Sequence, residues 1–179
     1  MTEIANVYGQ ALYDLAKDEG LTDKVLDQIT VLNESFTQEP GFLQLLCAPS
    51  VPKQERCQVL DDSLRGQVHP YVLNFLKILT EKGVVKVFSD CVSQYRKLYN
   101  EDHNILPVTA VTAVPLTQEQ SARLAGKLSE LTGKTAQLVN RVDPACLGGV
   151  RLDYDGKRVD GSVANRMESI RKLLKNTVL

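Results

Sequence analysis

The spacing of apolar residues changes near position 105 and divides the chain into two parts. Before that point, apolar residues recur every three to four positions, which is the spacing of amphipathic helices. After it, they alternate with polar or threonine positions in short runs, which is the spacing of β-strands. We therefore predict an α+β protein with one domain in residues 1–104 and a second in residues 105–179.

Six helices with short connections are predicted for the first domain, and together they would form a compact bundle. Gly20 and Pro40-Gly41 break the pattern, Thr22 is a candidate N-cap, and Pro52 suits the first turn of the fourth helix. No linker rich in Pro, Gly or Ser follows, so we expect the long sixth helix to lead directly into the second domain. The predicted helices cover residues 4–19, 22–37, 42–47, 52–64, 68–79 and 84–104.

The first and fifth predicted helices carry unusually wide apolar arcs. On a helical wheel each arc covers about half of the circumference, which exceeds the ~100° stripe that a helix needs to pack on one core. Two interpretations are open. Each helix is either well buried at the centre of the bundle, or it has two apolar contacts, one to its own bundle and one to a partner.

The second domain is predicted to be a small βαββα-like unit. Thr117 and Gln120 form a capping box at the start of its first helix, and Gly133 is a candidate C-cap. Asp155-Gly156 is a turn dipeptide suited to a type I′ hairpin. Gly148-Gly149 indicates a bulge or a close backbone approach. The predicted elements are a strand at 105–116, a helix at 117–131, a strand at 135–142, a hairpin at 150–160 and a helix at 163–175, with Ser162 as the N-cap of the last.

Composition excludes several classes of function. The net charge is −1, tryptophan is absent and only two histidines occur, so stacking platforms for single-stranded nucleic acid are not expected. The four cysteines form no C-x-x-C pair, and we interpret them as reduced, mostly buried thiols. The start of the sequence is acidic and lacks the basic and apolar regions of a signal peptide. No apolar run approaches the ~20 residues that a membrane span needs, so we expect a soluble protein without direct membrane insertion.

No residue constellation predicts catalysis, a metal site or a cofactor. Gly133-Lys134-Thr135 resembles part of a phosphate loop only superficially, because the preceding glycine is wrongly spaced and the order is helix, turn, strand. Asp61 and Asp62 are adjacent on a helix and therefore do not face each other. Ser63 and His69 lack the nucleophile-elbow motif that would support a triad. We predict that the chain is not an enzyme.

Basic residues gather in the second domain, whereas acidic residues outnumber them in the first. The cluster comprises Arg151, Arg158, Arg166, Arg171, Lys172 and Lys175. A nucleic-acid face is one interpretation, because clustered positive charge attracts phosphate. Asp153, Asp155, Asp160 and Glu168 lie between these residues, which favours a mixed surface or a docking face for an acidic protein segment.

Two stretches resemble a known family. Leu147-Gly148-Gly149-Val150 and the Asp160-Gly161-Ser162 turn, followed by an Arg-rich helix, are similar to the C-terminal signature of the delta subunits of F-type ATP synthases. The mitochondrial counterpart is the oligomycin-sensitivity-conferring protein. Residues 8–16 also resemble the opening of that family, although Gly9 replaces the usual alanine and should weaken the helix.

The resemblance implies a non-catalytic stator subunit without a cofactor. In the family, the first domain captures N-terminal helices of alpha subunits on the catalytic head, mainly through helices one and five. Carried onto this chain, the resemblance assigns that site to Tyr8, Ala11, Leu12, Leu15, Val25, Phe75, Ile78 and Leu79. The signature residues Gly148, Gly149, Asp160, Gly161 and Ser162 are assigned structural roles, with the glycines as backbone requirements.

The resemblance also implies the remaining partners and the location. The second domain would bind the C-terminal end of the b subunits of the peripheral stalk, and beta subunits are a further candidate partner. One copy per complex would lie at the cytoplasmic side of a bacterial cell membrane, as a peripheral part of the F1 sector. The alternative is a free-standing interaction module, or an RNA-associated protein that uses its basic second domain.

Overall fold

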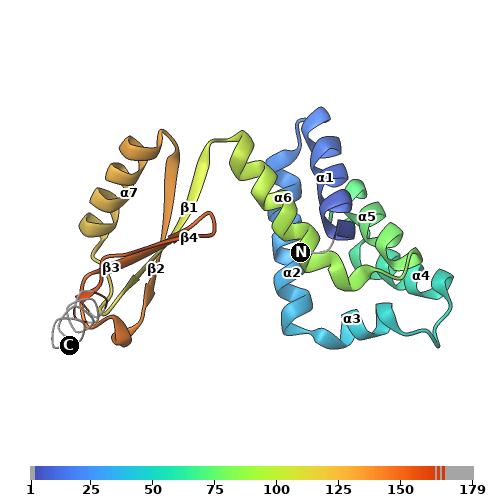
Figure 1. The fold of residues 1–179 in the computed structure, drawn as a ribbon. Coiled ribbons are helices and arrows are strands. Elements are labelled where there is room, and N and C mark those ends of the chain that lie inside the picture. The colour runs from blue at the N-terminus through green and yellow to red at the C-terminus, as the bar shows by residue number, and fades with distance from the viewer. Residues whose placement is uncertain (1–2, 164, 166, 168–179) are drawn as a thin grey trace. The chain divides into compact units, whose positions relative to one another are not determined.

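The chain folds into two compact units, residues 1–99 and residues 100–179. A computed structural model describes residues 3–163, 165 and 167 (Figure 1). The described residues contain seven α-helices and one four-stranded sheet, which confirms the α+β class. The first strand begins at Ile105, one residue after the predicted domain boundary.

The regular structure described before the first strand is helical, apart from one isolated β-bridge between Arg65 and Val68. The helices agree with the sequence pattern in number and, within a few residues, in position. They are α1 (Glu3–Asp18), α2 (Thr22–Gln38), α3 (Pro40–Cys47), α4 (Lys53–Leu64), α5 (Pro70–Glu81) and α6 (Phe88–Asp102), with a 3-10 turn at Val85–Val87 (Figure 1).

Two helix starts differ from the prediction. Thr22 is not an N-cap: Leu21 occupies that position, and the Leu21 N–H donates to Ala16 O at 2.8 Å in the tight α1–α2 connection. The helix predicted at 84–104 instead begins as the 3-10 turn. There the Val84 N–H donates back to Leu79 O at 2.9 Å after Gly83 (φ +71°), so α6 starts only at Phe88.

The core of the first unit is built around aromatic contacts. Tyr13 of α1 packs edge-on against Tyr95 of α6 with ring centroids 5.2 Å apart. The Tyr95 hydroxyl donates to Thr22 O at 3.0 Å, so this buried polar group is satisfied. Phe88 packs against Phe36 at 5.4 Å, which joins α6 to α2. Because aromatic side chains bury large apolar areas, these contacts fix how α1, α2 and α6 pack.

Gly9 lies where α1 approaches α6 closely. A Cβ at this position would lie 2.9 Å from Cys91 O and 2.9 Å from Gln94 Cβ. The glycine therefore allows the two backbones to come together. The expectation that Gly9 only weakens α1 is incomplete, because its lower helix propensity is offset by closer packing.

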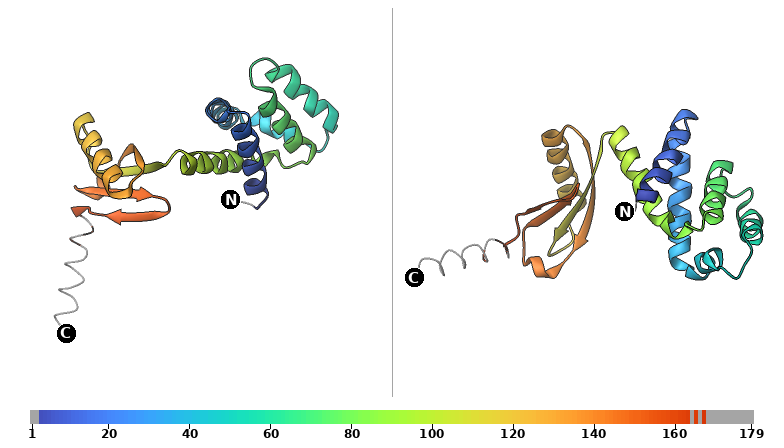
Figure 2. Two further views of the ribbon diagram at one scale, coloured as in Figure 1. Left: turned by 90° about the horizontal axis from the view of Figure 1, so that it is seen from above. Right: turned by 45° about the vertical axis from the view of Figure 1, so that its right-hand side comes forward.

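The second unit is a mixed sheet with α7 (Gln118–Thr132) on one face (Figure 2). The strands run in the order β2-β1-β3-β4. They are β1 (Ile105–Thr112), β2 (Thr135–Val142), β3 (Val150–Tyr154) and β4 (Lys157–Asp160). β1 and β2 are parallel and joined through α7, whereas β1–β3 and β3–β4 are antiparallel.

Among the described residues of the second unit the order is βαβββ, one strand more than the βαββα-like pattern names. The hairpin contributes both β3 and β4 in addition to β2. Its turn is as predicted, because Asp155 and Gly156 both have positive φ, at +47° and +69°. Of the helix predicted at 163–175, Val163, Asn165 and Met167 are helical, and the other positions lie outside the described residues.

The two predicted caps of α7 are confirmed. The Gln120 N–H donates to Thr117 Oγ1 at 3.2 Å, and the Thr117 N–H donates to Gln120 Oε1 at 2.9 Å, which completes a capping box. Gly133 adopts the left-handed conformation at the other end, with φ +69°. Gly133-Lys134-Thr135 thus ends a helix and starts β2, and it has no phosphate-loop geometry.

Candidate functional site

The candidate site is an apolar groove between α1 and α5. Figure 1 shows the two helices that line it. Its volume is about 210 Å³, and none of its lining residues is charged. Four residues come from each helix: Tyr8, Ala11, Leu12 and Leu15 from α1, and Tyr71, Asn74, Phe75 and Ile78 from α5.

The same spacing on both helices produces this groove. On each helix the lining residues follow the pattern i, i+3, i+4 and i+7, which places them on one face. Two apolar stripes that line one groove can accept a third helix that has an apolar stripe of its own. The arrangement suits binding of an amphipathic helix and offers no reactive group.

Six of the eight residues assigned to the partner site are brought together in this groove. Val25 and Leu79 are not, because both are fully buried in the core, at 0% exposure. Val25 lies on the core-facing stripe of α2, and Leu79 is rotated about 100° around α5 from Ile78. Both side chains belong to the packed core of the first unit and have no exposed surface to offer a partner.

The sequence interpretation missed Tyr71 and Asn74. Both line the groove on α5. The signal was present, because Tyr71, Asn74 and Phe75 continue the stripe that ends at Ile78. Asn74 is polar, and yet it lies inside the otherwise apolar stripe.

The wide apolar arc of α1 is divided between two environments. One part is buried in the core: Ala5, Gly9, Leu12, Tyr13 and Ala16. Another part remains exposed, with Ile4 at 46%, Val7 at 63% and Leu15 at 41%. A helix buried on all sides would not expose these side chains, so α1 fits the interpretation with a second apolar contact.

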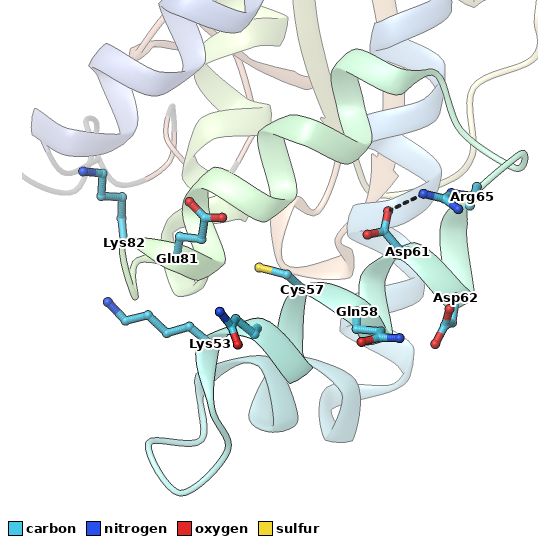
Figure 3. Close-up of a pocket in the computed structure, with 9 residues that line it drawn as sticks. Lys53, Cys57, Gln58, Asp61, Asp62, Arg65, Glu81 and Lys82 are labelled. Carbon is cyan, nitrogen blue, oxygen red and sulfur yellow. Dashed lines mark ion pairs between the residues drawn. The ribbon is translucent and has the colours of Figure 1, made fainter.

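A further pocket, on the first unit, is polar and has mixed charge (Figure 3). It measures about 780 Å³ and is lined by Lys53, Gln54, Cys57, Gln58, Asp61, Asp62, Arg65, Glu81 and Lys82. Asp61 lies 2.5 Å from Lys77 Nζ and 3.9 Å from Arg65 Nη2, so its charge is compensated. Burial, followed by the Glu81 charge, raises the pKa of the Cys57 thiol, which keeps it protonated and weakly nucleophilic.

The other chemical candidates have structural roles. His69 is the N-cap of α5, where its Nδ1 accepts from the Tyr71 N–H at 3.4 Å, and this role does not fit a triad. Within residues 3–163 and the two further described positions, no group of three or more His, Cys, Asp or Glu side chains could hold a metal ion. Among the helices described, none has the length and apolar character to cross a membrane.

The glycine-rich signature connects the start of β3 to the end of β4. A Cβ on Gly149, whose φ is +78°, would lie 2.7 Å from Gly161 O and 3.0 Å from Ser162 Cα. The Gly161 N–H donates to Val150 O at 3.1 Å, and the Val163 N–H donates to Gly148 O at 2.9 Å. These backbone contacts support a structural role for the glycines.

The two polar residues of the signature make local hydrogen bonds. Asp160 Oδ1 accepts from the Ser162 N–H at 2.9 Å, and hydrogen bonds from Ser162 lower the pKa of the Asp160 carboxyl. Ser162 Oγ accepts from the Asn165 N–H at 3.2 Å, as expected for an N-cap. The turn therefore ends the hairpin and starts the next helix.

Basic residues on the hairpin are paired with acidic ones. Arg158 Nε donates to Asp153 Oδ1 at 2.7 Å, and Arg151 Nε lies 3.7 Å from the other oxygen of the same carboxylate. This arrangement fits the mixed surface better than an uncompensated phosphate-binding face. Arg166, Arg171, Lys172 and Lys175 lie outside the described residues.

Comparison with known proteins assigns the family. The family model "ATP synthase delta (OSCP) subunit" matches residues 4–174. The ATP synthase subunit delta of Alkaliphilus oremlandii is 32% identical over 96% of this chain and 95% of its own length. The corresponding subunit of Lactobacillus delbrueckii subsp. bulgaricus is 34% identical, with 96% of each chain covered.

A solved structure shows the same fold at low identity. A chain of the Toxoplasma gondii mitochondrial ATP synthase hexamer superposes with a TM-score of 0.76 at 19% identity, covering 97% of this chain and 98% of its own. Together with the family match along nearly the whole sequence, this confirms the resemblance that the two sequence stretches indicated. The chain belongs to the ATP synthase delta (OSCP) subunit family.

Proposed function

We propose that the α1–α5 groove binds the N-terminal helix of an alpha subunit of the catalytic head. The main support for this proposal is the pair of matching apolar stripes, with four residues on each helix, which lie beside the exposed apolar residues of α1. A helix in this groove would cover Ile4, Val7 and Leu15, and large exposed apolar patches commonly mark interaction sites. The recognition mode is helix-in-groove, with partner side chains at i, i+3, i+4 and i+7.

Membership of the family makes the chain a non-catalytic stator subunit of an F-type ATP synthase, and its partners are other subunits of that complex. Within this role, residues 1–104 act as a six-helix bundle that binds the head. Residues 105–179 bind the C-terminal end of the b subunits, and beta subunits provide a further contact. One copy per complex lies at the cytoplasmic side of a bacterial membrane, as part of the F1 sector.

The physical task of such a subunit is mechanical. It holds the head against rotor torque, so binding strength and stiffness matter and proton chemistry does not. The absence of charge in the α1–α5 groove suits this task, because apolar contact does not weaken with salt as exposed ion pairs do. The RNA-associated alternative receives no support from the comparisons, and the paired arginines of the hairpin do not favour it.

Calorimetric titration with a peptide from the N-terminus of an alpha subunit tests the proposal. The parent protein should bind one peptide. Ile78→Asp places a charge in the groove and should weaken binding by about 100-fold, which corresponds to about 2.7 kcal/mol. Ala11→Glu alters an exposed position of the same groove and should also weaken binding, which covers the case in which Ile78→Asp fails to fold.

Leu131→Asp is the matched control, because Leu131 is an exposed leucine of α7 outside the groove. It introduces the same charge and should leave the affinity unchanged. A folded parent that binds no peptide would contradict the proposal. Equal loss of affinity in Leu131→Asp would attribute the effect to charge in general and not to the α1–α5 groove.

A further inference from the structure

A second apolar groove, which we name the α2 groove, shares no lining residue with the α1–α5 groove. Its volume is about 470 Å³. The walls come from α2, from the start of α3, from the end of α4 and from the segment that joins α4 to α5. The lining residues are Asp27, Gln28, Val31, Leu32, Ser35, Phe36, Glu39, Phe42, Ser63, Leu64, Gln67 and Val68.

The α2 groove follows the length of α2. Asp27, Val31, Ser35 and Glu39 line it at every fourth position, up to the residue that caps the helix. At 1.5 Å per residue, the twelve steps from Asp27 to Glu39 span roughly 18 Å. That length matches about three turns of a partner helix lying along α2.

The floor of the α2 groove is preformed. Phe36 stacks on Phe42 with ring centroids 5.5 Å apart and an interplanar angle of 23°. Phe36 also contacts Phe88 in the core, so the aromatic floor continues into the packed interior. Val31, midway along the groove, is 61% exposed. A partner would therefore contact an aromatic surface that is already fixed and an exposed aliphatic side chain. Few side chains of the groove would have to become ordered on binding.

The opposite wall is held in place by contacts to α2. The His69 N–H donates to Gln28 Oε1 at 2.8 Å, which ties the start of α5 to α2. The preceding turn contains a β-bridge between Arg65 and Val68. Leu64 and Val68, both half-buried, form the apolar part of this wall.

The charges of the α2 groove indicate the chemistry of its partner. Asp27 and Glu39 are the two charged lining residues, and they lie at opposite ends of the α2 stripe. Both are acidic. From this complementarity we propose that the α2 groove binds a basic amphipathic helix of a partner protein, with an apolar stripe over Val31 and Phe42. Lys or Arg side chains about three turns apart would reach the two carboxylates.

This assignment is separate from the proposed function, because the α1–α5 groove has no charged lining residue and would not select for a basic helix. An extended peptide fits the α2 groove less well. Apart from one isolated β-bridge, the regular structure described in the first unit is helical and contains no strand on which a peptide could add. An anionic membrane surface is disfavoured by the two carboxylates.

Two designed peptides of about 18 residues test the proposal on the full-length protein. They share one leucine stripe and differ only in their flanking residues, which are lysine in one and glutamate in the other. Fluorescence anisotropy should show that the lysine peptide binds at least about tenfold more tightly. Val31→Asp should weaken that binding about tenfold or more, since interface centres carry most of the affinity. Leu131→Asp should leave it unchanged.

Reversing the two charges of the α2 groove provides a second, independent test. The double variant Asp27→Lys/Glu39→Lys should prefer the glutamate peptide. Ser35→Arg, at an exposed position of the same stripe, blocks the groove by size and keeps the test valid if Val31→Asp does not fold.

Three outcomes would overturn the proposal. Equal binding of both peptides to the parent would remove the charge argument. Loss of lysine-peptide binding in Ile78→Asp, with Val31→Asp unaffected, would assign the binding to the α1–α5 groove. A dimer of the parent that Val31→Asp dissociates in sedimentation would assign the α2 groove to a second copy of the chain.

Discussion

Gly9 has a low helix propensity, but the close packing of α1 on α6 requires it. Glycine costs helix stability, yet a methyl group here would lie 2.9 Å from the Cys91 carbonyl oxygen. We predict that Gly9→Ala lowers the free energy of unfolding by about 1–3 kcal/mol, because the crossing of α1 and α6 must open. Urea denaturation measures this change.

Gly126→Ala is the matched control for Gly9→Ala. Gly126 is exposed in the middle of α7, and a Cβ there would meet nothing within 4 Å. This substitution should raise stability by about 0.5–1 kcal/mol through helix propensity alone. If Gly9→Ala were equally stabilising, α1 and α6 would not be as close as the structure has them.

A comparison of alanine substitutions at Gly149 and Gly156 distinguishes the cost of backbone strain from the cost of a steric clash. Both have positive φ, but only Gly149 faces backbone atoms at 2.7–3.0 Å. Gly156→Ala should cost about 1 kcal/mol for strain, and Gly149→Ala should cost clearly more because the Gly161 carbonyl must also move. Thermal unfolding of the second unit compares them. Equal costs would show that the close approach in the signature is unimportant.

Cys91 provides a pH test. Burial, followed by the Asp90 charge, raises the pKa of its thiol from 9.0 to about 11. The unfolded thiol loses its proton at lower pH than the folded one. This contribution to stability is therefore fully present below pH 9 and is lost as the pH rises to about 11. Between these values the unfolding free energy of Cys91→Ala should fall less steeply than that of the parent. Parallel curves in a pH series of denaturant titrations would contradict the assignment.

At the scale of single helices, the groove depends on which residues share a face. Tyr71 lines the α1–α5 groove at the start of α5 without being part of the fully buried core. Tyr71→Ala should weaken binding of the alpha-subunit peptide about tenfold, because partly buried aromatic residues often dominate interfaces. Calorimetry measures the affinity, and circular dichroism confirms the fold. An unchanged affinity would place the partner helix elsewhere on α1.

A substitution of Leu79 tests whether this side chain stabilises the core or contacts the partner helix. It is fully buried one position after Ile78. Leu79→Ala should lower the free energy of unfolding by about 2–5 kcal/mol through the cavity that it leaves. At temperatures where the variant is folded, peptide affinity should change little. A large loss of affinity in a folded Leu79→Ala variant would show that this side chain contacts the partner after all.

The sequence pattern predicted the helices well because packing on one core enforces a three-to-four residue spacing. It could not separate core from groove on α5, where Leu79 and Ile78 are adjacent and equally apolar. The pattern also could not predict the packing role of Gly9, because only the short distance between the backbones of α1 and α6 makes a glycine necessary there. The start of α2 was misplaced because Leu21 is held by a carbonyl of the preceding helix, a contact that no local motif encodes.

At the scale of the whole molecule, the chain consists of two compact units, and the hydrophobic core cluster around α1 and α5 is made of residues from the first unit. We predict that residues 1–104 fold alone and bind the alpha-subunit peptide as tightly as the full chain does. The basis is that all eight groove residues and the core beneath them belong to the first unit. Circular dichroism and calorimetry of the fragment test this. A folded fragment that binds more than tenfold more weakly would show that the second unit contributes to the site.

The α1–α5 groove is the proposed binding site for the catalytic head. A nuclear magnetic resonance titration of the full-length protein with the alpha-subunit peptide tests this proposal most directly. The largest amide shifts should occur in α1 and α5, around Ala11, Leu15, Asn74 and Ile78. Shifts confined to the α2 groove or to the second unit, with α1 and α5 unaffected, would contradict it.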